Sequence, residues 1–264
     1  MPIWIYELHP FWAVIVLMVF AETVSISGLL LTRRFILPRL VYRDNEPVSG
    51  TVQAIGVFYG ITVGLIAVGV WNTNSSATEL VSKEATAIAT LHRDFGGYPA
   101  TFRDALRPKL REYTVFVIEQ AWPAQKIGQG QRLDAGARIL DDLQSKLYSF
   151  EPTTPGQVAL HTETLSAYNK LIEYRRLRLD AVDNQLSGVM WLVIWIGAAI
   201  SITIAYFYKI EDPKLHVTLV ALMAAFLAML LFMIVINDRP FFGYISISSE
   251  PYKLILDRVL DLSK

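Results

Sequence analysis

Glu22 has the most unusual chemical setting in the sequence, because it is the one charged residue in an otherwise apolar run over residues 11–31. A carboxylate in the middle of a membrane span is costly unless it is protonated, paired or hydrated. Ser25 lies one helical turn further along, close enough to donate a hydrogen bond to it. Two interpretations follow: Glu22 faces a water-filled cavity as an ion or proton site, or it is protonated and holds neighbouring helices together.

Glycines repeat in the second apolar run, at Gly56, Gly60 and Gly64, with Gly69 one residue off this register. A spacing of four places the first three on one helix face, where a second backbone can approach closely. The face therefore either packs against another helix, within one subunit or between subunits, or it lines a conduit. The spacing indicates close contact without deciding between packing and conduction.

No arrangement typical of an enzyme is present. The four histidines are scattered, and no H-E-x-x-H pair, phosphate-binding glycine loop or G-x-S-x-G elbow occurs. The absence of cysteine excludes disulfides and thiolate metal sites. The 24 basic and 24 acidic residues cancel, which argues against a nucleic-acid partner. We therefore expect neither catalysis, a cofactor nor a metal site.

The elements that carry these residues are helices long enough to cross a bilayer, which requires about 20 apolar residues each. They cover residues 11–31, 52–71, 189–208 and 215–236. The chain is 53% hydrophobic and 18% charged, whereas soluble proteins carry about 25% charged residues. The first run has no basic residues before it and no cleavage site after it, so we interpret it as a retained helix. The sequence predicts an all-α, multi-pass integral membrane protein, in the inner membrane if the host is bacterial.

The connections between these runs predict a two-plus-two arrangement of spans. We divide the chain into a helix pair over 1–71, a helical extramembrane domain over 72–187, a second pair over 188–236 and a tail over 237–264. The short loop over 32–51 contains four arginines, and the loop at 209–214 contains two lysines. The positive-inside bias places these loops in the cytoplasm and the helical domain outside.

The segment 72–187 has the periodicity of helices throughout. Apolar residues recur every 3.6 positions from Leu80 to Phe95 with no breaker after Trp71, so the helix over 52–71 is predicted to continue to residue 95. Two further helices are expected at 102–121 and 133–147. A seven-residue repeat at positions 165, 172, 179 and 186 predicts a helical seam that continues unbroken into the span at 189–208. The arginines at 175, 176 and 178 are interpreted as solvated or salt-bridged.

Two short motifs resemble those of a known family. A turn containing Pro240, Phe241 and Gly243 follows the last span, and Glu84 and Ala85 form a pair after the second span. With the two-plus-two layout, these features resemble the bestrophin channels. The chain is still more similar to a bacterial family described as bestrophin-like.

This resemblance implies an ion channel built as a ring of subunits, pentameric in known bestrophins, in which the second helix lines the pore. It also implies that the helical domain lies in the cytoplasm, whereas the charge bias of the loops places it outside. The side of the membrane on which this domain lies therefore stays undecided. The acidic run that binds calcium in animal bestrophins is absent, so calcium gating is not expected. Carried over to this sequence, the candidate lining residues are Ile55, Phe58, Tyr59, Ile61, Thr62, Leu65, Val68 and Asn72.

The leading hypothesis is therefore an oligomeric channel in the lipid bilayer that conducts small ions passively. The alternative is a non-conducting membrane scaffold, which binds a partner through its helical domain and assembles through the glycine face. Transport coupled to protonation of Glu22 is the weakest of the three, because the paired broken helices of many secondary transporters are missing.

Overall fold

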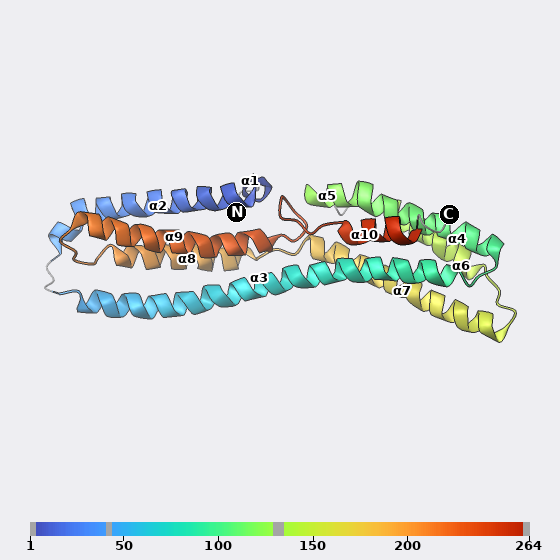
Figure 1. Ribbon diagram of the computed structural model, residues 1–264. Coiled ribbons are helices and arrows are strands. Elements are labelled where there is room, and N and C mark those ends of the chain that lie inside the picture. Colours follow the sequence, from blue (N-terminus) through green and yellow to red (C-terminus); the bar gives the residue numbers. More distant parts are fainter. Residues whose placement is uncertain (1–3, 41–43, 129–134, 261–264) are drawn as a thin grey trace. The chain divides into compact units, whose positions relative to one another are not determined.

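The computed structural model describes residues 4–40, 44–128 and 135–260, and these residues form helices and no strands (Figure 1). The chain divides into two compact units. Unit 1 contains the residues up to Thr73 together with Gln185–Asp238, and unit 2 contains Asn74–Asn184 together with the residues from Arg239 onwards. Each unit has its own core.

In the described part of the chain, four helices are long and apolar enough to cross a membrane, which confirms the predicted spans, and their membrane parts belong to unit 1. The short helix α1 precedes the first of them. The elements are α1 (Trp4–Glu7), α2 (Pro10–Phe35), the short η1 (Leu37–Arg39), the first part of α3 (Glu46–Phe95), α8 (Gly188–Ala205) and α9 (Pro213–Asp238).

Helices α2 and α9 pack side by side in unit 1 (Figure 1). Leu29 of α2 and Val220 of α9 are buried with Ala205 and Tyr206, which lie at the end of α8. The packing is close because small residues lie at the contacts: a Cβ atom added to Gly28 would come within 2.7 Å of the Tyr206 hydroxyl oxygen. Small residues at such contacts are the usual way in which membrane helices gain packing energy.

Helix α3 meets α8 through a similar contact. The Tyr59 hydroxyl donates a hydrogen bond to the Ile194 carbonyl at 3.0 Å. The Tyr59 ring lies directly on Gly197, where an added Cβ would overlap its ring carbons. A buried tyrosine hydroxyl needs such a partner, and the carbonyl provides it without a second polar side chain.

Two helices were predicted to run without a break from the membrane into the helical domain. This prediction is right for α3 and wrong for α7 and α8, which are separate helices. Helix α3 is unbroken from Glu46 to Phe95. In contrast, α7 (Pro155–Val182) ends before α8 begins at Gly188. The reason is that the intervening backbone finds other partners: the Ser187 hydroxyl accepts the Met190 N–H at 3.3 Å. The Leu186 N–H donates to the Asp238 carboxylate at 2.6 Å. Such side-chain partners begin a new helix instead of extending the old one.

Unit 2 is a helical bundle around a single core. The helix predicted at 102–121 extends to Lys126, because a π-helical turn at Val117–Ala121 joins its two parts. The helix predicted at 133–147 is described from Ala135 to Tyr148, and residues 133 and 134 lie outside the described part. Besides α3 and α7, the elements are α4 (Ala100–Phe116), η2 (Val117–Ala121), α5 (Trp122–Lys126), α6 (Ala135–Tyr148), α10 (Glu250–Ile255) and η4 (Leu256–Leu260).

The predicted seam of α7 is displaced by one residue. Thr164, Leu171 and Arg178 are the buried positions, whereas Leu165, Ile172 and Leu179 are half-buried. Tyr168 also belongs to the core, with its hydroxyl donating to the Leu140 carbonyl at 2.9 Å. The helix is rotated because an arginine occupies a core position that hydrophobicity alone assigns to a leucine.

We predict that Gly197→Ala destabilises unit 1 by roughly 1–3 kcal/mol, the usual effect of overpacking a close contact. The added methyl group would displace the Tyr59 ring and its hydrogen bond to Ile194. The measurement is the unfolding of the full chain in detergent. Gly188→Ala is the matched control in the same helix, because its Cβ would meet nothing within 4 Å. Equal stabilities of the two variants would contradict the predicted contact.

Candidate functional site

The membrane part of α3 has one side packed in unit 1 and another that nothing in this unit covers. Its packed side includes Tyr59, Val63 and Val70. Among the predicted lining residues, Tyr59 is therefore buried against α8 and does not lie on the uncovered side. Thr62 and Asn72 are exposed, and Ile55 is half-buried. The remaining candidates are large apolar side chains with high exposure: Phe58 71%, Leu65 70%, Ile61 57% and Val68 54%.

The glycine face of α3, made by Gly56, Gly60 and Gly64, is open. A Cβ atom added at any of these positions, or at Gly69, would meet nothing within 4 Å. Packing of this face within the subunit, one of the alternatives considered above, is therefore wrong, because the neighbouring helix α8 lies against Tyr59 instead. Within the described residues this face has no cover, which leaves it to another subunit, lipid or pore water.

Glu22 is half-buried on α2. Its expected neighbour Ser25 is almost fully buried and lines a small apolar cavity between α2, α8 and α9. The Glu22 carboxylate forms no hydrogen bond or ion pair with the residues that the structure describes. Packing inside the subunit therefore gives Glu22 no polar partner, and both interpretations of this residue remain proposals.

The strongest polar interaction lies in unit 2, between Glu84 of α3 and Arg178 of α7. The Arg178 Nε and the Glu84 Oε2 are 2.6 Å apart, and Nη2 and Oε1 are 3.3 Å apart. Both side chains are almost fully buried, at 2% and 0% exposure. The Tyr113 hydroxyl of α4 donates to Glu84 Oε1 at 2.6 Å. Burial, followed by the charge of Glu84, raises the pKa of Tyr113 well above its ordinary value, so this hydroxyl remains a donor.

Aromatic side chains close this centre on its other side. The Arg178 guanidinium lies 5.6 Å from the Trp122 ring centroid, a cation–π distance. Trp122 makes edge contacts with Phe241 at 5.8 Å and Tyr252 at 5.4 Å. Its indole N–H donates to the Ile247 carbonyl at 3.0 Å. The residues after α9 are thereby joined to the buried ion pair.

The turn after α9, noted in the sequence at Pro240, Phe241 and Gly243, has a structural role here. The Pro240 carbonyl accepts the Ile247 N–H at 2.7 Å. Gly243 has a positive φ of 81°, which glycine adopts without strain. Its N–H donates to the Lys126 carbonyl at the end of α5, at 3.3 Å. The turn fixes the chain against α5 and shows no ligand-binding geometry of its own.

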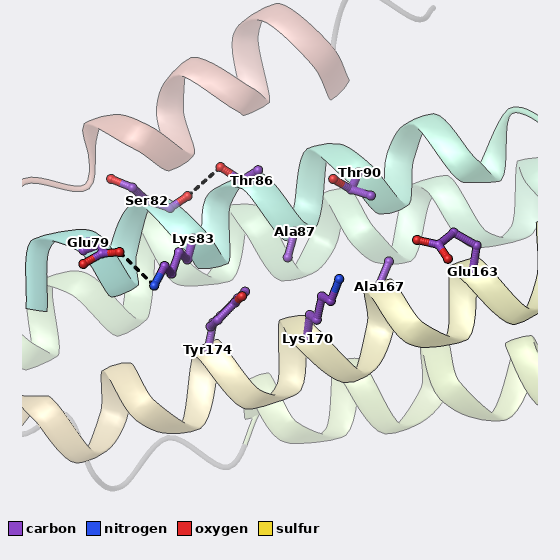
Figure 2. Close-up of a pocket in the computed structure, with 10 residues that line it drawn as sticks. All are labelled: Glu79, Ser82, Lys83, Thr86, Ala87, Thr90, Glu163, Ala167, Lys170 and Tyr174. Carbon is purple, nitrogen blue, oxygen red and sulfur yellow. Dashed lines mark hydrogen bonds and ion pairs between the residues drawn. The ribbon is translucent and has the colours of Figure 1, made fainter. Parts of the chain in front are cut away.

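A groove of about 400 Å³ runs between α3 and α7 in unit 2 (Figure 2). Two carboxylates and two amines line it: Glu79 pairs with Lys83 at 2.8 Å, and Glu163 and Lys170 project from α7, with the two amines between the two carboxylates. These charges cancel, so the groove favours neither sign of ion. Among the described residues no cluster of three or more histidine, aspartate or glutamate side chains could hold a metal ion.

In the sequence, Glu84 belongs to a short motif and Arg178 is one of three neighbouring arginines, and nothing in the pattern predicts that these two residues form an ion pair. The signal that could have linked them is the position of Arg178 within a helical seam, because a buried arginine requires a buried acid. The partner itself lies 94 residues away, and periodicity alone does not identify it.

The fold has close counterparts among solved structures. A variant of a bacterial bestrophin homologue from Klebsiella pneumoniae matches with a TM-score of 0.69 at 12% identity, over 95% of this chain and 98% of that chain. A second variant of this homologue gives 0.65 at 11% identity over the same shares. A structure named only as a membrane protein gives 0.66 at 13% identity over 95% and 98%. No curated protein sequence matches the chain.

These likenesses define the class: an all-helical integral membrane protein with the bestrophin fold. The sequence itself goes further, because a model of the bestrophin-like domain matches residues 19–252. The chain belongs to the bestrophin-like family. The resemblance inferred from the Glu84 pair and the turn at Pro240 is confirmed, and family membership supports an ion-channel kind of function.

We predict that Glu84→Gln lowers the free energy of unfolding by roughly 3–5 kcal/mol, because it leaves the buried Arg178 charge without a counterion. The measurement is unfolding of the full chain in detergent. Glu79→Gln is the matched control on the same helix: its ion pair with Lys83 is exposed, and such pairs contribute at most about 1 kcal/mol. A loss no larger in Glu84→Gln than in Glu79→Gln would disprove the role of the pair.

Proposed function

We propose that this chain assembles into a ring of identical subunits and conducts small ions passively through a central pore. The exposed face of α3 in the membrane lines that pore. The observation that carries the proposal is the open face itself: glycines at 56, 60 and 64 and large apolar side chains nearby, which no described residue covers. Family membership supports the same kind of function.

The chemistry of this face suits a gated conduit. Phe58, Ile61 and Leu65 are apolar and exposed, and a ring of such side chains closes a narrow pore by excluding water. The glycines leave the backbone uncovered, so the pore is wider where they face it. Asn72, at the end of the span, supplies an amide at the mouth of the pore. Tyr59 is not part of this lining, because α8 covers it.

The second candidate function is a membrane scaffold that does not conduct. The spacing of Gly56, Gly60 and Gly64 favours it, because such a face brings helices of two subunits together. In that case the oligomer forms by contact between α3 helices, no water-filled pore runs beside Leu65, and unit 2 provides the binding surface for a partner.

Cysteine substitution separates the two, because the natural chain has no cysteine. We expect Leu65→Cys in liposome-reconstituted protein to react with a water-soluble charged thiol reagent, lowering the flux of potassium or chloride by at least about tenfold, a barrier increase of roughly 1.4 kcal/mol. The matched control is Leu222→Cys on α9, since these leucines are 70% and 63% exposed. Leu222 faces lipid, and its variant stays unmodified.

Flux and accessibility together decide the outcome. A closed ring that passes neither ion, with Leu65→Cys as unreactive as Leu222→Cys, would support the scaffold and exclude the pore. Gly60→Leu adds an independent check: it narrows a conduit and reduces flux while the ring persists, whereas in a scaffold it disrupts assembly, as size-exclusion chromatography would show.

A further inference from the structure

A small basic pocket lies in unit 1, where the ends of α2 and α9 meet the two short loops. Its volume is about 210 Å³, and it is lined by Arg33, Lys209 and His216. None of the lining residues is acidic. The rest of the lining is apolar or aromatic: Leu37, Leu40, Tyr208 and Ile210.

Arg33 is held in place by the buried ring of His216, which is 1% exposed. The His216 Nε2 lies 3.1 Å from the Ala205 carbonyl oxygen, so this nitrogen carries the proton and donates. The His216 Nδ1 is then the acceptor for Arg33 Nη1 at 3.3 Å. Arg33 Nη1 also lies 3.5 Å from the Ile210 carbonyl oxygen. The guanidinium is thus positioned at the pocket without being neutralised.

Lys209 is fixed through its backbone. The side-chain amide of Asn45 accepts the Lys209 N–H at 2.7 Å and donates to the Lys209 carbonyl at 3.0 Å. Asn45 belongs to the loop before α3, and Lys209 to the loop before α9. This double hydrogen bond joins the two loops and orders the backbone from which the ammonium group extends.

Two acids close to the pocket in the sequence accept backbone N–H groups at helix starts. Asp44 accepts the Glu46 N–H at 3.3 Å and Asp212 accepts the Lys214 N–H at 2.8 Å, at the starts of α3 and α9. Neither Arg33 nor Lys209 has an ion-pair partner within the described part of the chain. A positioned guanidinium and a lysine on an ordered backbone, neither with a counterion, form a site for an anion, and these two groups suit phosphate oxygens.

The surroundings favour a lipid as the source of that phosphate. The pocket lies at the ends of membrane-spanning helices, the level at which lipid headgroups are found. Large apolar side chains next to it on the chain are exposed: Leu31 59%, Phe35 52%, Ile36 45% and Leu40 43%. They offer acyl chains a surface that a free phosphate ion does not need.

We propose that this pocket binds the phosphate group of an anionic phospholipid, with Arg33 and Lys209 contacting the phosphate and the acyl chains lying along the end of α2. The bound lipid neutralises two charges and connects both short loops to the bilayer. This proposal does not depend on conduction, because it concerns a different face of unit 1.

The test is native mass spectrometry of the full chain in detergent, titrated with phosphatidylglycerol or phosphatidylcholine. We expect tighter binding of phosphatidylglycerol by at least about tenfold, with roughly tenfold weaker binding in Arg33→Gln and in Lys209→Gln, the usual effect of losing one charge-assisted hydrogen bond. The Lys209 variant avoids a folding artefact, since the loop is held by backbone bonds to Asn45.

Arg34→Gln and Lys214→Gln are the matched controls, each with the same charge change close by in the sequence. Arg34 is exposed over the Phe35 ring, and neither control residue lines the pocket. They should bind phosphatidylglycerol as the wild type does. Equal binding of both lipids, or equal weakening in the controls, would overturn the site. Displacement of the lipid by inorganic phosphate at similar concentration would overturn the lipid as its source.

Discussion

The buried pair of Glu84 and Arg178 is the constraint on which unit 2 depends. Two charges removed from water are tolerated only when each has the other, so α3 and α7 must pack with Glu84 beside Arg178. Tyr113 completes the coordination of the carboxylate, and Trp122 covers the guanidinium. Helix α3 is unbroken from Glu46 to Phe95 and carries both Glu84 of unit 2 and Leu65 of unit 1.

Much of this fold could be predicted from the sequence, because its signals are local. A run of 20 apolar residues identifies a span wherever it lies, and α3 is continuous because no residue between Trp71 and Phe95 stops a helix. The break before α8 could not be predicted in this way. It depends on Asp238, which lies 52 residues from the Leu186 N–H that it accepts. The rotation of α7 has a similar origin, since Glu84 draws Arg178 into a position that hydrophobicity assigns to Leu179.

For the candidate sites, too, local signals could be predicted from the sequence and long-range contacts could not. The spacing of Gly56, Gly60 and Gly64 predicted a face suited to close contact, but only the structure shows that no described residue lies within 4 Å of a Cβ added there. The basic pocket had no signal in the sequence. His216 was one of several scattered histidines, and Arg33 was counted only as a loop charge. Their hydrogen bond joins residues 183 positions apart, a proximity that follows from the packing of α2 on α9.

Asp238 also sets an order of events during synthesis. Its carboxylate accepts hydrogen bonds from the Tyr6 hydroxyl at 2.9 Å and the Leu186 N–H at 2.6 Å. The residue lies at the end of the last span, so the ribosome reaches it after all four spans have been made. The hydrogen bonds of Tyr6 and Leu186 to this carboxylate therefore cannot form until residue 238 has been synthesised. A chain interrupted before position 238 lacks the carboxylate that bonds both Tyr6 and Leu186.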